Sequence, residues 1–142
     1  MRKVVVDSSV AIKWFVPQPH SINALEILNE YRDGSLSLLA PDLIYAEVGN
    51  IIWKLHRFQD LSDPDAQAIL KAFQLVTFVV TPSASLLDDA YSLAVTHQRT
   101  VYDALYIALS FRHQCQFVTA DEKLVNAVSG KLLDVILITD WS

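Results

Sequence analysis

Cysteine and glycine are scarce in this chain of 142 residues. The single cysteine, Cys115, excludes an internal disulfide and a zinc site built from several cysteines. Only three glycines are present, and hydrophobic residues make up 52% of the chain, so the composition is that of a folded protein with a real core. The length suits one domain, which we expect to span residues 1–142.

Long apolar runs are also missing. No run reaches the ~18 residues needed to cross a bilayer. The apolar stretch near the N-terminus is three valines long and ends at Asp7, which excludes a signal peptide. We therefore expect a soluble, cytoplasmic protein with no membrane partner.

Positive charge is in short supply, because 11 Lys and Arg face 16 Asp and Glu and the net charge is −5. Proteins that coat RNA or DNA through electrostatics alone are usually basic, so this balance argues against a simple coating module. It does not exclude an enzyme whose acids bind a divalent cation, because the bound ion changes the local charge.

Short apolar runs alternate with longer segments of helical period. Strands are predicted at Lys3–Val6, Leu36–Ala40, Thr77–Thr81, Phe117–Ala120 and Val135–Thr139. Helices are predicted between them, the clearest over Asp42–Phe58 and another after the start signal Ser62-Asp63-Pro64. This alternation predicts an α/β fold of three α/β/α layers, with a central, mostly parallel sheet of about five strands.

Two acids directly follow predicted strands. Asp7 comes after the three valines, and Asp121 comes after the stretch FVTA. Ligands of parallel α/β sheets bind at the carboxyl ends of the strands, so both acids belong to the edge where ligands bind. Asp121 has a second interpretation, because it could simply cap a short helix that runs to Ala127.

Two further acids lie on predicted helices. Asp103 stands at the start of the helix in TVYDALYIALSFRH, where an acid is favoured by the helix dipole and can cap free N–H groups. Glu47 lies beside the apolar stripe of the helix over Asp42–Phe58, so its carboxylate points toward the sheet more than into water. Taken alone, Glu47 could equally be an edge glutamate that reaches solvent or pairs with a lysine.

Four converging acids would repel one another and raise their pKa values. A hard divalent cation removes this conflict, since Mg²⁺ prefers oxygen ligands and Mn²⁺ accepts the same set. Such a site can bind a phosphodiester and lower the pKa of a water. The sequence therefore favours a Mg²⁺ or Mn²⁺ site built from Asp7, Glu47, Asp103 and Asp121.

Four stretches carry a family resemblance, and they occur in order along nearly the whole chain: DSSVAIKWFVP, PDLIYAEVGNIIWK, TVYDALYIALS and FVTADEKL. Together they resemble the PIN-domain ribonucleases, most closely the VapC-type toxins of toxin–antitoxin pairs. The resemblance implies a metal-dependent endoribonuclease that cleaves single-stranded RNA. It also implies a homodimer and a VapB-like antitoxin as partner.

Carried over by position, the four acids of the family's metal site are Asp7, Glu47, Asp103 and Asp121, and none is missing. The resemblance implies that Asp7 and Asp103 are the principal metal ligands. Ser9 matches a small polar residue of the first motif and would hydrogen-bond an acid or a phosphate. Thr119 shares a strand face with Asp121 and could do likewise.

Rival interpretations fit less well. A haloacid-dehalogenase-type phosphatase requires an acid two residues after the first one, where this chain has Ser9. A response-regulator receiver requires a lysine after the last strand, where Asp140 and Trp141 stand. A non-catalytic RNA- or protein-binding module that kept the acidic pocket stays open as the alternative.

Overall fold

The computed structural model describes residues 1–142, and its elements alternate as the sequence predicts. The strands are β1 (Arg2–Val6), β2 (Leu36–Pro41), β3 (Val79–Thr81), β4 (Gln116–Thr119) and β5 (Val135–Leu137). The helices are α1 (Ser8–Ala11), α2 (Ser21–Arg32), α3 (Leu43–Phe58), α4 (Asp63–Gln74), α5 (Ser83–His97), α6 (Val101–His113) and α7 (Glu122–Val128). Two 3₁₀ turns, η1 (Ile12–Trp14) and η2 (Ile138–Asp140), complete the list.

All five strands are parallel and lie in the order β3-β2-β1-β4-β5. The chain therefore builds one half of the sheet outward from β1 and then returns to build the other half from β4. The order reverses between β1 and β4, and the crevice at such a reversal is where open parallel sheets bind ligands. Asp7 and Asp121 follow these two strands.

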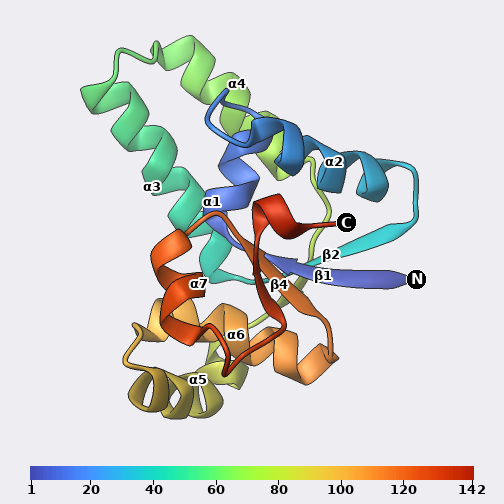
Figure 1. Cartoon of the computed structure of the whole chain (residues 1–142). Coiled ribbons are helices and arrows are strands. Elements are labelled where there is room, and N and C mark those ends of the chain that lie inside the picture. Colours follow the sequence, from blue (N-terminus) through green and yellow to red (C-terminus); the bar gives the residue numbers. More distant parts are fainter.

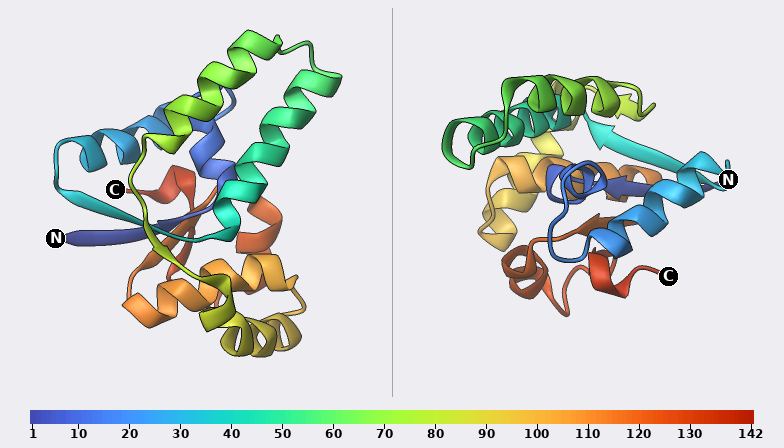
Figure 2. Two further views of the ribbon diagram at one scale, coloured as in Figure 1. Left: turned by 180° about the vertical axis from the view of Figure 1, so that it is seen from behind. Right: turned by 90° about the horizontal axis from the view of Figure 1, so that it is seen from above.

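Helices cover both faces of the sheet, as the predicted three-layer arrangement requires (Figures 1 and 2). Helix α6 packs against β1, β2 and β4, and α5 packs on α6. On the opposite side α2 packs against β2, while α3 and α4 form a helical pair that projects from the body of the molecule (Figure 1). None of these helices is both long enough and apolar enough to serve as a membrane span.

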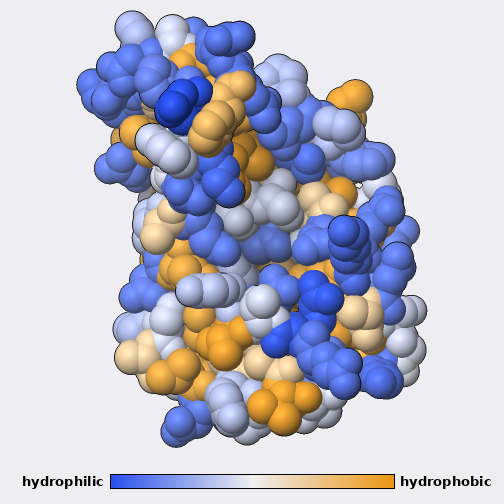
Figure 3. Space-filling view, turned by 90° about the vertical axis from the view of Figure 1, so that its left-hand side faces the viewer, coloured by the Kyte–Doolittle hydropathy of each residue, from blue (hydrophilic) through white to orange (hydrophobic).

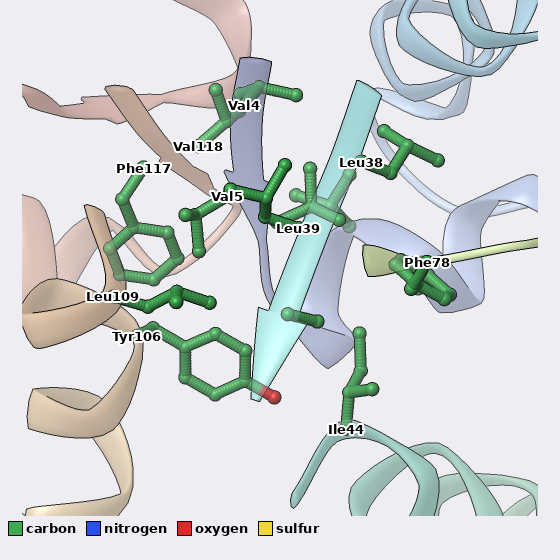
Figure 4. Close-up of a cluster of buried hydrophobic side chains, with 14 of the residues drawn as sticks. Val4, Val5, Leu38, Leu39, Ile44, Phe78, Tyr106, Leu109, Phe117 and Val118 are labelled. Atoms are coloured by element: carbon green, nitrogen blue, oxygen red, sulfur yellow. The ribbon is translucent and has the colours of Figure 1, made fainter. Parts of the chain in front are cut away.

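One cluster of 37 buried hydrophobic residues fills the interior. Val4, Val5 and Val6 of β1 are completely buried, as expected for a central parallel strand covered on both faces. Figure 4 shows Val5 of β1 between Leu39 of β2 and Phe117 of β4. This core fixes the ends of β1 and β4, and so the backbone on which the polar residues beyond them stand.

The predicted strands are confirmed, with shifts at their ends. The strand predicted at Thr77–Thr81 starts only at Val79, and the one predicted at Val135–Thr139 stops at Leu137, because the chain turns into η2. Trp53 and Phe58 in the outer half of α3 are 53% and 67% exposed, so they contribute little to the core.

Candidate metal-binding active site

Asp7 stands where β1 ends and α1 begins, and both oxygens of its carboxylate accept hydrogen bonds. Its Oδ1 accepts hydrogen bonds from the Ser9 backbone N–H at 3.1 Å, the Ser9 hydroxyl at 2.5 Å and the Val10 N–H at 3.3 Å. Its Oδ2 accepts the Thr119 hydroxyl at 2.6 Å. Asp7 is therefore both the N-cap of α1 and part of a polar network that joins β1 to β4.

Thr119 and Ser9 form the centre of that network. Thr119 is completely buried, and its Oγ1 also accepts the Asp121 N–H at 3.1 Å. The Ser9 hydroxyl oxygen accepts the Ala120 N–H at 2.9 Å. The two small hydroxyl residues thus fix the chain after β4 against Asp7, which places Asp121 at the same edge of the sheet.

The capping alternatives for Asp121 and Asp103 have different outcomes. Asp121 is the N-cap of α7, because its Oδ1 accepts the Leu124 N–H at 3.2 Å. Asp103 is not a cap, because α6 begins at Val101 and the Thr100 hydroxyl caps it by accepting the Asp103 N–H at 3.1 Å. The Asp103 carboxylate is therefore free of the helix end and pairs with Arg99, whose Nη2 lies 3.1 Å from Oδ2.

Glu47 lies on α3 and points toward α6, where Tyr106 donates its hydroxyl to Glu47 Oε1 at 2.5 Å. This bond joins α3 to α6 through two residues that lie 59 positions apart in the chain. The interpretation of Glu47 as an edge glutamate paired with a lysine is wrong, since its partner is a neutral phenol.

Burial and repulsion between acids raise the pKa values of Asp7, Glu47 and Asp103. Burial lifts the pKa of Asp7 from 3.8 to about 6, against the lowering effect of the Ser9 and Thr119 hydroxyls, and the charge of Glu47 adds to the rise. Burial also raises the pKa of Glu47, with a contribution from the charge of Asp103. Burial raises the pKa of Asp103 in turn, with a contribution from Asp121. Charge interactions thus link Asp7 to Glu47, Glu47 to Asp103 and Asp103 to Asp121, and we call these four residues the acidic cluster.

Compensating positive charge is sparse around the cluster. The Arg99 guanidinium lowers the pKa of Asp103 against the larger effect of burial. Burial lowers the pKa of Lys13, and the charge of Asp7 opposes this lowering. The Lys13 ammonium itself donates to Gln18 Oε1 at 3.2 Å and not to an acid. Two cations beside four carboxylates leave the cluster with excess negative charge, which a divalent ion would neutralise.

The donor set fits such an ion in chemistry, since all four acids offer oxygen ligands. The structure contains no group of three or more His, Cys, Asp or Glu side chains that are close enough together to hold a metal ion. Mg²⁺ typically takes one or two carboxylates and keeps several waters, and Asp7 and Glu47, whose charges interact, offer two carboxylates. The residues present therefore fit a hydrated divalent cation bound by few carboxylates.

Tyr106 was not predicted from the sequence as a site residue. It lies three positions after Asp103, so both side chains occupy one face of α6. Burial, with the charges of Glu47, Asp7 and Asp103, raises its pKa far above the ordinary value, so the phenol stays protonated and remains a donor. A buried tyrosine needs a partner for its hydroxyl, and this need is the signal that could have identified it.

Comparison with known proteins places the chain among characterised relatives. The PIN domain family model matches residues 4–129. "Ribonuclease VapC3" of Pyrobaculum aerophilum is 32% identical over 124 residues, which cover 86% of this chain and 92% of that protein.

Solved structures give the same fold at lower identity. A crystal structure from Pyrobaculum aerophilum has a TM-score of 0.73 at 22% identity. The match covers 97% of this chain and 85% of the chain in that structure. A toxin–antitoxin complex from Klebsiella pneumoniae contains a chain with a TM-score of 0.63 at 15% identity, with 95% of this chain and 97% of that chain covered. At these identities the two structures speak for the fold alone.

Proposed function

Because the chain belongs to the PIN-domain family and is a ribonuclease of the VapC type, we propose that it cleaves single-stranded RNA with a divalent cation bound by its acidic cluster. The proposal is supported by the charge interactions that link Asp7 to Glu47, Glu47 to Asp103 and Asp103 to Asp121, with little positive charge beside them. The proposed cation is Mg²⁺ or Mn²⁺.

Asp7 and Asp103 are the proposed principal ligands, and Glu47 and Asp121 bind directly or through water. A bound divalent cation would supply the charge that draws in a phosphodiester oxygen and lowers the pKa of a water. The acids of the cluster also limit which groups can enter, because a phosphodiester meets their repulsion unless a cation is present. No side chain of the cluster is a covalent nucleophile in this proposal.

Ser9 and Thr119 act in this proposal through Asp7. Both hydroxyls donate to the Asp7 carboxylate, and this support keeps its oxygens in one orientation. Outer partners of this kind orient metal ligands and tune their basicity. We therefore assign them to the support of the metal ligand, and direct contact with substrate is not required of them.

The first test uses purified protein and a pool of single-stranded RNA oligonucleotides with Mn²⁺ or Mg²⁺. We expect cleavage that stops when EDTA removes the cation and returns when Mn²⁺ is added in excess. Gel analysis of end-labelled RNA gives the result. Cleavage that persists in EDTA would contradict the metal dependence, and metal binding without any cleavage would favour the alternative of a non-catalytic binding module.

An antitoxin is the proposed regulatory partner, because the chain belongs to the PIN-domain family and resembles the VapC-type toxins of toxin–antitoxin pairs. We expect a VapB-like protein encoded beside this chain to suppress RNA cleavage when the two are mixed in equal amounts. A partner that binds in size-exclusion chromatography while cleavage continues would count against this role.

A homodimer is the other proposed assembly. Its support is an apolar stripe along one face of α5, where Leu87, Tyr91 and Val95 are 51%, 63% and 62% exposed at a spacing of four residues. Figure 3 shows apolar surface gathered on the lower part of the molecule, where α5 and α6 lie. Light scattering at micromolar protein decides between monomer and dimer, and a strictly monomeric mass would remove this proposal.

A further inference from the structure

Tyr106 is held rigidly by the core beneath the acidic cluster. Its side chain is only 2% exposed, and its ring stacks on the buried ring of Phe117 with centroids 5.5 Å apart and planes 13° from parallel. Figure 4 shows the ring beside Leu109 and Phe117, with its hydroxyl directed away from them, toward the end of β2 and the start of α3. The hydroxyl therefore occupies a position fixed by packing on β4.

Glu47, by contrast, has a long side chain that is only partly buried. Fixing a glutamate side chain costs rotamer entropy, so an unsupported Glu47 would sample several orientations. The hydrogen bond from Tyr106 to Oε1 anchors it. A carboxylate offers about four lone-pair sites, so acceptor capacity remains for a cation after this bond forms.

The group that holds Glu47 is the uncharged phenol of Tyr106, and this has an electrostatic consequence. Asp103 is paired with the Arg99 guanidinium, a positive charge that offsets part of its own. Tyr106 holds Glu47 by a neutral donor, so the orientation is fixed while the negative charge is kept. Keeping the charge matters because the attraction for a divalent cation depends on it.

We propose that Tyr106 is a positioning residue of the metal site, whose hydroxyl holds the Glu47 carboxylate in the orientation that serves a bound divalent cation. This inference rests on the proposed function of the acidic cluster. Asp103 and Tyr106 share one face of α6, so this helix contributes a ligand and the donor that orients another ligand from α3.

The test measures Mn²⁺ binding by isothermal titration calorimetry, without RNA, in wild type and Tyr106→Phe. The Phe variant keeps the stacked ring and removes only the hydroxyl, so we expect unchanged circular dichroism and a Kd for Mn²⁺ about 10-fold weaker. Tyr31→Phe is the matched control, because its hydroxyl accepts the Thr77 N–H at 2.8 Å and has no contact with the acids. The control should leave the Kd for Mn²⁺ unchanged.

A double-mutant cycle separates positioning from a general structural effect. If Tyr106 acts through Glu47, Tyr106→Phe should change the Kd for Mn²⁺ less than twofold in a Glu47→Gln background. Equal losses in both backgrounds, or wild-type affinity in Tyr106→Phe, would overturn the proposal. Absence of Mn²⁺ binding by wild type would overturn it together with the proposed metal site, whereas a metal-loaded wild type that cuts no RNA would overturn the proposed function alone.

Discussion

Replacing Asp7 by Asn is expected to reduce divalent-dependent RNA cleavage by roughly 1,000-fold, equivalent to about 4 kcal/mol of transition-state stabilisation. The amide is nearly isosteric and can still accept the Ser9 hydrogen bonds, but it lacks the charge that binds a cation. Initial rates of cleavage at saturating Mn²⁺ measure the effect. The same loss is expected for Asp103→Asn, since both acids are proposed as principal ligands.

Asp88→Asn is the matched control for this experiment. Asp88 is an exposed acid on α5 outside the cluster, so the variant makes the same change in net charge without touching the site. It should cleave RNA at the wild-type rate. Full activity in Asp7→Asn would remove Asp7 from the mechanism, and equal losses in Asp7→Asn and Asp88→Asn would attribute the effect to net charge.

The same Asp7→Asn substitution is expected to stabilise the metal-free protein at neutral pH. Burial raises the pKa of Asp7 to about 6 in the folded state, from an ordinary value of 3.8. The folded state therefore binds this proton more tightly than the unfolded chain, so folding loses stability as the pH rises from about 4 to about 6. The rise in pKa corresponds to an upper limit of about 3 kcal/mol above pH 6.

Urea unfolding of both proteins in EDTA, between pH 3.5 and 8, measures this difference. We expect the free energies of unfolding to coincide near pH 3.5 and the variant to be about 2–3 kcal/mol more stable at pH 7.5. Adding Mn²⁺ at pH 7.5 should stabilise wild type and leave the variant nearly unchanged, because only wild type offers the full ligand set. A gap between the two proteins that does not change with pH would show that Asp7 carries no such burial cost.

The sequence predicts the fold well because short apolar strands alternate along the chain with helices of clear period. The three valines of β1 illustrate this, since a central parallel strand is buried on both faces and shows no alternation. The ends of β3 and β5 were less predictable. Residues 77 and 78 carry strand-forming side chains yet lie before the ladder with β2, and register is set by the partner strand and not by composition.

The candidate site could be predicted as a set of acids but not as a hydrogen-bond network. Strand ends placed Asp7 and Asp121 at one edge of the sheet, because the carboxyl ends of parallel strands meet there. The phenol of Tyr106 could not be assigned to Glu47 in the same way. Helical period gives the face on which a side chain lies, but the distance between α3 and α6 depends on packing between elements far apart in the chain.

The order of the strands also bears on when the protein can act. Asp7 meets Thr119 across 112 positions of the chain, so the first acid gains its partner only after β4 has paired with β1. A nascent chain of the first hundred residues lacks Asp103, Thr119 and Asp121, so it would lack part of the proposed metal site. The proposed metal site would therefore be complete only when synthesis of the 142 residues is almost finished.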